Sequence, residues 1–428
     1  MFLTEQRETQ MTAGRQGKAN ETITPHDPRR TTDSAPGAPR AGRLPGPHQH
    51  SAAPAEPRRA QDGRSGYTAQ ALERDIDHLY PELPHPETTR DLLPSTGTEI
   101  LLPETARRLH GRLHAALITP VRQTVDHGGR RWRPTLAATV VEALGADSRP
   151  YGPLWAACEL LHTGSLIIDD IQDGAPLRRG RPSAHLEHGT ALAINAGTTA
   201  YFSMHRAIRQ TLPDDPRLRS RVYETYLDAL QAAHAGQALD LQGHHEEMSV
   251  ALTTGDTTVV RQLVAQTHRL KSGAPVAAVF RIAALVAEAD PAQCDALAAL
   301  GEAVGTAYQI TDDVADLRGV SRQGAATKRV AEDLLNAKVT YPLVRALARM
   351  PQDEARQLWE QVRSGLDADG AARAARRIAD CGALDECADE AHRMVYDAWK
   401  KASDRLRPSP SGRSLGALCA EVLHSRIA

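Results

Sequence analysis

The stretch Glu159-Leu-Leu-His-Thr-Gly-Ser-Leu-Ile-Ile-Asp-Asp-Ile-Gln-Asp173 begins as an apolar run with helical spacing and ends in three carboxylates. Residues four apart lie on one face of a helix, so Asp169 and Asp173 share a face, whereas Asp170 lies about 100° around the axis. Three acids at the negative end of a helix repel one another and require cations. Their hard oxygen ligands suit Mg²⁺ or Ca²⁺. Taken alone, this motif also fits a solvated acidic patch.

A second stretch, Tyr308-Gln-Ile-Thr-Asp-Asp-Val-Ala-Asp316, repeats the arrangement with carboxylates at Asp312, Asp313 and Asp316. Two such clusters predict two carboxylate plates that face each other. Mg²⁺ is typically bound by a few carboxylates together with phosphate oxygens of a substrate. The pair of clusters therefore predicts a site in which several Mg²⁺ ions bind a diphosphate.

The composition predicts an all-α protein. Ala, Leu, Arg and Glu dominate the 428 residues, aromatic residues make up 4%, and runs of Val, Ile and Thr are few. A hydrophobic content of 41% is enough for a sizeable core. Residues 67–428 are predicted to form one large helical domain. Residues 1–66 contain few branched apolar residues and many Pro, Gly and Arg, which predicts a disordered N-terminal tail.

Charge and cysteine usage exclude several classes of function. The formal net charge of −2 does not indicate a nucleic-acid partner. The five cysteines are scattered without a CxxC pair, which argues against a zinc site or a disulfide framework and predicts reduced thiols in the cytoplasm. No apolar run approaches the ~18 residues that a membrane span needs, and no signal-peptide pattern is present.

Two basic features complement the acids. In His127-Gly-Gly-Arg-Arg-Trp-Arg-Pro134 the glycines permit a tight turn and Pro134 suits the first turn of a helix, so Arg130 and Arg133 flank a helix N-terminus. Such a position favours an anion, although an ordinary basic loop has the same composition. Only six lysines occur, because arginine supplies most of the positive charge. Those near the second cluster, where a compact charge suits a diphosphate, are Lys271, Lys328 and Lys338.

With these motifs assembled, the chain resembles the trans-isoprenyl diphosphate synthases, or polyprenyl synthetases, and is most similar to geranylgeranyl diphosphate synthases. The resemblance covers roughly residues 128–342 and rests on GGRRWRP, ELLHTGSLIIDDIQD, LRRGRPSAH, GQALDL, KSG, YQITDD and the K-x4-D-x4-K run that leads to TYP. It implies a single large helical bundle around a central cavity, with both acid clusters at its mouth. It also implies a homodimer.

The resemblance assigns roles to individual residues. The implied Mg²⁺ ligands are Asp169, Asp170, Asp173, Asp312, Asp313 and Asp316. The implied groups around the allylic diphosphate are Arg178, Lys271, Ser272, Gln309, Lys328 and Lys338. The implied groups around isopentenyl diphosphate are Arg130, Arg133, His162 and Arg179. The residues expected to act in catalysis are Asp169, Asp170, Asp173, Arg178, Lys271, Asp312 and Asp313. Three departures from the family pattern are Arg130 in place of the usual lysine, Ser272 in place of threonine, and Ala331 in place of glycine.

The implied reaction is the head-to-tail condensation of isopentenyl diphosphate with an allylic diphosphate. Cations make the allylic diphosphate a better leaving group, and no protein nucleophile is needed. Ser165 and Gly164, four and five residues before Asp169, are small, so we expect an open cavity there and a shorter product from Gly164→Phe. Tyr201 and Phe202 are candidates for an aromatic floor. Together they favour a twenty-carbon product, geranylgeranyl diphosphate, over longer chains.

Two other classes remain as alternatives. A class I terpene cyclase also ionises a diphosphate with Mg²⁺, but normally pairs one aspartate-rich motif with an Asn/Ser/Glu motif. It would also have no use for the arginines assigned to isopentenyl diphosphate. A non-catalytic subunit that binds prenyl diphosphates predicts eroded acid clusters, whereas both clusters are intact in this sequence.

Overall fold

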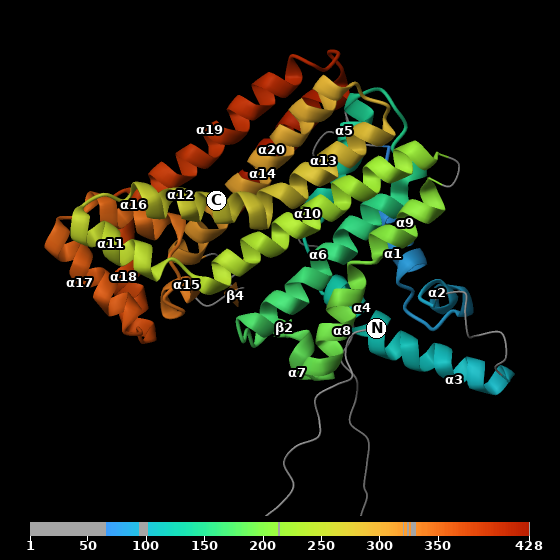
Figure 1. The fold of residues 1–428 in the computed structure, drawn as a ribbon, viewed down its shortest axis with the longest axis horizontal. Coiled ribbons are helices and arrows are strands. Elements are labelled where there is room, and N and C mark those ends of the chain that lie inside the picture. Colours follow the sequence, from blue (N-terminus) through green and yellow to red (C-terminus); the bar gives the residue numbers. More distant parts are fainter. Residues whose placement is uncertain are drawn as a thin grey trace, which may run out of the picture. The chain divides into compact units, whose positions relative to one another are not determined.

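The protein is described by a computed structural model that covers residues 66–93, 102–212, 215–319, 321–322, 325–326 and 331–427. All of these belong to one compact unit, Ala60–Ala428. The predicted all-α class is confirmed, because the strands in the described part form only two short antiparallel hairpins (Figure 1). These are β1–β2 (Leu177–Arg178 with Arg181–Pro182) and β3–β4 (Ser321–Arg322 with Ala325–Ala326). The predicted tail lies outside the described residues except for Gly66, and Lys328 also lies outside them.

The helices before the first acid cluster and the cluster's own helix are α1 (Ala69–Leu79), α2 (Pro86–Asp91), α3 (Pro103–Leu113), η1 (His114–Ile118), α4 (Thr119–Asp126), α5 (Trp132–Ala143), η2 (Arg149–Tyr151) and α6 (Gly152–Gln172). The middle of the chain forms α7 (Ala184–His188), α8 (Thr190–Ala200), α9 (Ser203–Thr211), α10 (Pro216–Gln242), α11 (His245–Thr254), α12 (Thr258–His268), η3 (Arg269–Gly273) and α13 (Ala274–Val286). The remainder forms α14 (Pro291–Arg318), α15 (Glu332–Leu335), α16 (Tyr341–Arg349), α17 (Gln352–Arg363), α18 (Ala368–Asp380), α19 (Ala383–Ser403) and α20 (Pro410–Ile427).

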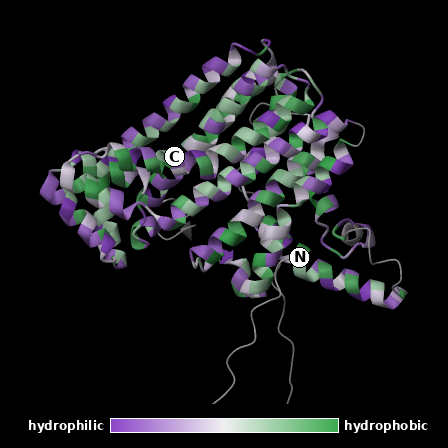
Figure 2. Ribbon diagram, viewed as in Figure 1, coloured by the Kyte–Doolittle hydropathy of each residue, from purple (hydrophilic) through white to green (hydrophobic). Residues whose placement is uncertain are grey.

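The two long helices that carry the acid clusters run through the core. Helix α14 begins with a capping box, in which the Asp290 carboxylate accepts a hydrogen bond of 2.9 Å from the backbone N–H of Gln293, and the Gln293 side-chain oxygen accepts one of 3.1 Å from the backbone N–H of Asp290. It packs against α13, α19 and α20, which run beside it in Figure 1. Helix α6 buries Leu154, Trp155 and Leu160 completely. In contrast, α19 alternates hydrophilic and hydrophobic residues, as expected for a helix at the surface (Figure 2).

Glycines allow a π-helical turn, η3, to pass between two of these helices. A Cβ atom on Gly236 of α10 would lie 2.3 Å from the backbone nitrogen of Lys271. On the opposite side, a Cβ atom on Gly305 of α14 would lie 2.3 Å from the backbone oxygen of Ser272. Real Cβ atoms do not approach backbone atoms so closely, so only glycine lets α10 and α14 close on this turn. The turn that carries Lys271 and Ser272 is therefore held from both sides.

Another glycine contact joins α6 to α8 and corrects one expectation. A Cβ atom on Gly164 would lie 2.4 Å from the carbonyl oxygen of Gly197 and 2.7 Å from the Cβ atom of Ala200. Gly164 therefore faces the backbone of α8 and does not line an open cavity. The expected open space at Gly164 is therefore absent, and a phenyl ring introduced by Gly164→Phe would force the two helices apart.

None of the described helices combines the length and the apolar character that crossing a membrane would require.

We predict that Gly164→Ala lowers the stability of the protein by about 1–3 kcal/mol, because the added methyl group overlaps backbone atoms that cannot move independently. The measurement is the free energy of unfolding in urea. Gly111→Ala is the matched control, because a Cβ atom there meets nothing within 4 Å. In an open helical position alanine is favoured over glycine by up to about 1 kcal/mol, so this variant should be unchanged or more stable. Equal stabilities for the two variants would contradict the tight contact between α6 and α8.

Candidate active site

Both acid clusters meet at the η3 turn. Lys271 lies with its Nζ 3.3 Å from Asp169 Oδ1, at the end of α6. The next residue, Ser272, donates a hydrogen bond of 2.8 Å to Gln309 Oε1 on α14. Gln309 in turn donates to Asp313 Oδ1 at 3.1 Å. Two adjacent side chains of one turn thus connect the first cluster to the second.

The first cluster combines a buried ion pair with more accessible carboxylates. Asp170 has only 1% of its side chain exposed and pairs with Arg178, whose Nε donates to Asp170 Oδ1 at 2.8 Å. Although burial opposes it, the carboxylates of Asp170, Asp169 and Asp312 raise the pKa of Arg178. Asp312 belongs to the second cluster, so Arg178 interacts electrostatically with carboxylates of both clusters.

The accessible carboxylates of this cluster repel each other. The side chain of Asp173 reaches solvent. Its pKa is nevertheless raised, first by the loss of part of its hydration and then by the negative charge of Asp169. Asp169 is a quarter exposed and accepts a hydrogen bond of 3.1 Å from Gln237 Nε2 of α10. A cation between Asp169 and Asp173 would relieve this repulsion.

Asp240 of α10 holds two of the predicted lysines side by side. Its Oδ2 lies 2.7 Å from Lys271 Nζ and 2.9 Å from Lys338 Nζ. Although burial opposes it, these two ammonium groups lower the pKa of Asp240 to about 2. The pKa of Lys338 is raised, against burial, chiefly by Asp240 and then by Asp333. The two ammonium groups are thereby held side by side, an arrangement that suits a phosphate.

The sequence prediction did not include Asp240 or Gln237 as site residues, although both lie in the GQALDL motif that it singled out. Their helical spacing, three apart, was the available signal, because residues at i and i+3 share a face. Their partners Asp169 and Lys338 are distant in sequence, so only the fold shows what that face contacts.

In the second cluster, Asp313 is enclosed by donors from three helices. Only 5% of its side chain is exposed. Besides Gln309, its carboxylate contacts His268 Nε2 of α12 at 3.3 Å and the backbone N–H of Tyr341 at the start of α16 at 3.3 Å. The His268 ring also stacks on the Tyr341 ring, with centroids 6.0 Å apart. Asp313 therefore ties α12, α14 and α16 together, and the prediction missed His268 as its partner.

Asp316, the last acid of this cluster, caps another helix. Its two carboxylate oxygens each accept a backbone hydrogen bond of 3.2 Å, from Glu332 and from Asp333 at the start of α15. The Ala331 amide donates to the Asp316 carbonyl at 2.9 Å. Ala331 adopts a left-handed backbone with φ of 58°, at the position where the family usually has glycine. Asp312, on the same helix, is half-buried.

The predicted basic cluster gathers around the start of α5. The guanidinium of Arg179 donates to the carbonyl oxygens of Thr124, at 3.0 Å, and of Gly128. A Cβ atom on Gly129 would lie 2.8 Å from this guanidinium, and Gly129 has a φ of 147°. The second glycine of the motif thus makes room for Arg179. The pKa of His162 is lowered well below its ordinary value by burial and then by Arg133 and Arg179, so this imidazole is neutral at pH 7.

The chemistry of these donors fits Mg²⁺. The carboxylates of Asp169, Asp173 and Asp312 are at least partly exposed and are hard oxygen ligands. Among the described residues, no three His, Cys, Asp or Glu side chains are already grouped as a metal site. The acids instead contact arginine and lysine, which supply the balancing charge.

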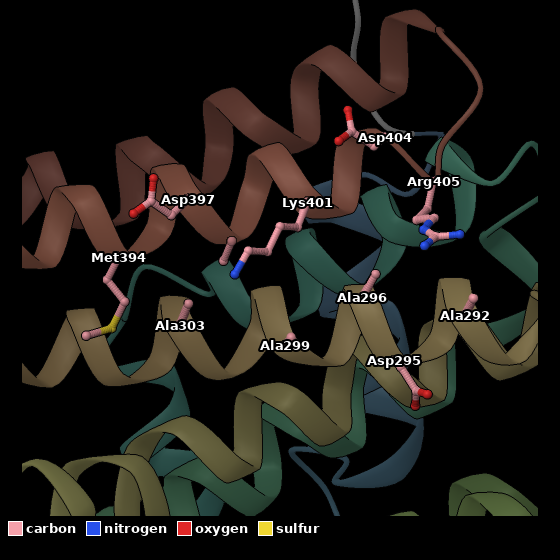
Figure 3. A pocket seen from close by; sticks show the side chains of 11 residues that line it. Ala292, Asp295, Ala296, Ala299, Ala303, Met394, Asp397, Lys401, Asp404 and Arg405 are labelled. Atoms are coloured by element: carbon pink, nitrogen blue, oxygen red, sulfur yellow. The ribbon is translucent and has the colours of Figure 1, made fainter.

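A cavity of about 930 Å³ lies elsewhere, between α14 and α19 (Figure 3). Its floor is formed by Ala292, Ala296, Ala299 and Ala303, in the half of α14 away from the acids. None of the predicted site residues lines it.

Comparisons with known proteins identify the family. The family described as Polyprenyl synthetase matches residues 114–378. The farnesyl diphosphate synthase of Geobacillus stearothermophilus is 33% identical over 288 residues, which cover 65% of this chain and 91% of that protein. A short chain isoprenyl diphosphate synthase of Methanothermobacter thermautotrophicus is 30% identical over 282 residues, which cover 66% and 81%.

Solved structures share the fold. The geranylgeranyl pyrophosphate synthetase of Pyrococcus horikoshii has a TM-score of 0.63 and 23% identity, and the match covers 83% of this chain and 95% of that one. Since the family match spans more than half of the sequence and curated relatives are prenyl diphosphate synthases, this chain belongs to the polyprenyl synthetase family and is a prenyl diphosphate synthase, a transferase.

Proposed function

We propose that this enzyme catalyses the Mg²⁺-dependent head-to-tail condensation of isopentenyl diphosphate with an allylic diphosphate, and that its main product is geranylgeranyl diphosphate. The observation that carries the proposal is the meeting of the two acid clusters at the Lys271–Ser272 turn. One site there offers carboxylates for cations and ammonium groups for a diphosphate.

The allylic diphosphate is proposed to bind between the clusters. Mg²⁺, held by Asp169, Asp173 and Asp312, would supply Lewis-acid charge to the leaving diphosphate. Lys271 and Lys338, gathered by Asp240, add positive charge that needs no rearrangement during the reaction. We propose that Lys328 joins them, on the resemblance alone.

The remaining predicted residues are assigned to orientation. Asp170 fixes Arg178 through a buried pair, so Arg178 can bind phosphate oxygens without first losing conformational freedom. Ser272, Gln309 and Asp313 form the hydrogen-bonded chain that holds the turn against α14. We therefore propose that Asp313 and Asp316 act on the site through the helices that they tie together.

Isopentenyl diphosphate is proposed to bind the basic cluster. Arg130, Arg133 and Arg179 supply charge for its diphosphate, and neutral His162 supplies a hydrogen-bonding partner. The double bond attacks the allylic cation, and the proton lost in the last step passes to the released diphosphate. A terpene cyclase would have no second diphosphate for this cluster.

We predict that Asp312→Ala and Asp169→Ala each lower kcat by at least about 10²-fold, because charge that stabilises the leaving group is lost. The measurement is incorporation of radiolabelled isopentenyl diphosphate with each allylic primer across a range of Mg²⁺ concentrations. The matched control is Asp295→Ala. Asp295 is an exposed acid on α14, the helix of Asp312, and pairs with Arg281 at 2.8 Å. A residual rate near that of the control would contradict the proposed role. Hydrocarbon formed without isopentenyl diphosphate would indicate a cyclase instead.

The product length is proposed from one aromatic contact. Tyr201, at the end of α8, is half-buried and meets His234 of α10 edge-on, with ring centroids 5.8 Å apart. Burial and then the charge of Asp169 raise the pKa of Tyr201, so its ring lies within reach of the first cluster. Phe202 is 67% exposed and does not contribute to a floor within this chain. We propose that Tyr201 limits chain growth.

We predict that Tyr201→Ala shifts the products toward chains longer than twenty carbons, because the ring proposed to stop the growing chain is removed. Dephosphorylated products are sized by chromatography. Tyr223→Ala is the matched control, since the Tyr223 ring also lies 5.8 Å from a histidine ring, that of His205, but between α9 and α10 and among partly exposed side chains. An unchanged product distribution for Tyr201→Ala would place the limit elsewhere.

We propose a homodimer and a cytoplasmic location. Helices α7 and α8 pack together and expose large apolar side chains, with Leu186 at 59% and Leu192 and Ile194 at 45%. Clustered exposed apolar residues mark protein interfaces. All five cysteines are unpaired, which suits a reducing compartment.

We predict that Ile194→Glu converts a dimer into monomers, because a carboxylate on this surface would lose its hydration on association. Sedimentation velocity measures the mass. Val259→Glu is the control, since Val259 is 59% exposed on α12, outside this surface. A variant at Ile194 that remains dimeric would place the interface on another surface.

A further inference from the structure

Two aromatic rings stand beside the arginines assigned to isopentenyl diphosphate. Trp132, the first residue of α5, and Tyr308 of α14 have ring centroids 5.2 Å apart at an angle of 44°. Arg133 Cζ lies 4.2 Å from the centroid of the Trp132 ring and 5.8 Å from that of Tyr308. Arg130 Cζ lies 5.7 Å from the Tyr308 centroid. Both guanidinium groups therefore lie at one aromatic pair.

These distances are those of cation–π contacts, for which tryptophan is the best partner. The guanidinium groups of Arg130 and Arg133 repel each other because both are positive, and the aromatic pair beside them offsets this repulsion. A ring occupies the flat face of a guanidinium, whereas hydrogen bonding occurs at its edge, so stacking and phosphate binding are compatible.

This geometry explains why residue 130 is an arginine. Lysine, the usual family residue at this position, carries a compact charge that cannot stack as a flat group. Arg130 also donates to the carbonyl oxygen of Val422 on α20, at 3.2 Å. Its guanidinium is thus fixed from α14 by a ring and from α20 by a carbonyl group. Trp132 is buried, so its own position is set by the core.

We propose that Trp132 and Tyr308 are positioning residues that orient the guanidinium groups of Arg130 and Arg133 for the diphosphate of isopentenyl diphosphate. This inference rests on the proposed function, which assigns those two arginines to that substrate. Tyr308 also precedes Gln309, which belongs to the hydrogen-bonded chain of the allylic side.

The first test separates the KM values of the two substrates. Trp132→Leu should raise the KM for isopentenyl diphosphate by about 5- to 30-fold, the value of one or two cation–π contacts, with the KM for the allylic substrate changed less than about twofold. Trp132→Phe keeps a ring and should raise the KM for isopentenyl diphosphate much less. Arg130→Lys keeps the charge but loses the stack, and should raise the same KM while changing the KM for the allylic substrate little. Tyr151→Leu removes a ring that pairs only with Trp155, at 6.3 Å, and is the matched control.

The second test needs no turnover. In EDTA, where the acid clusters hold no divalent cation, inorganic pyrophosphate should change the tryptophan fluorescence of the native enzyme, and Trp132→Phe should abolish that change. The proposal is overturned if Trp132→Leu and Arg130→Lys leave the KM for isopentenyl diphosphate unchanged, or raise both KM values equally. Failure of the native enzyme to consume isopentenyl diphosphate would instead refute the proposed function.

Discussion

The site depends on one packing constraint, the insertion of a π-helical turn between two helices that carry glycine where they touch it. Gly236 and Gly305 bring α10 and α14 within backbone contact of η3, so the turn cannot shift along or rotate within the bundle. Lys271 is consequently aimed at the first acid cluster and Ser272 at the helix of the second. A π turn inserts an extra residue into a helix, and such turns often occur at functional sites because the insertion re-aims side chains.

Around this turn the buried and half-buried cations are each paired with a carboxylate. Asp170 with Arg178 and Asp240 with Lys271 and Lys338 are buried or half-buried, where a lone charge would be costly. Each pair fixes the orientation of a cation before any ligand arrives. Asp169 and Asp173 remain more accessible, and the Mg²⁺ proposed to bind there would relieve their mutual repulsion.

The sequence was sufficient for the fold class, and it predicted that the two acid clusters act together. Helical periodicity is local, and the repeated acid spacing of residues 169–173 and 312–316 is visible without a structure. What could not be derived was which neighbour each helix face meets. Gly164 looked like an open position because it is small, whereas it is small because the backbone of α8 lies against it. His268 and Asp240 were missed for the same reason, since their partners lie far along the chain.

Asp316 has a consequence for how the sequence of this enzyme can vary. The Asp316 carbonyl and carboxylate accept hydrogen bonds from the backbone of residues 331–333. Both ends of the segment between residues 316 and 331 are therefore held at Asp316. Insertions or deletions between these two anchored points leave both ends in register. Relatives can therefore differ in the length of this segment while the lysine at position 338, a few residues beyond the second anchor, keeps its place.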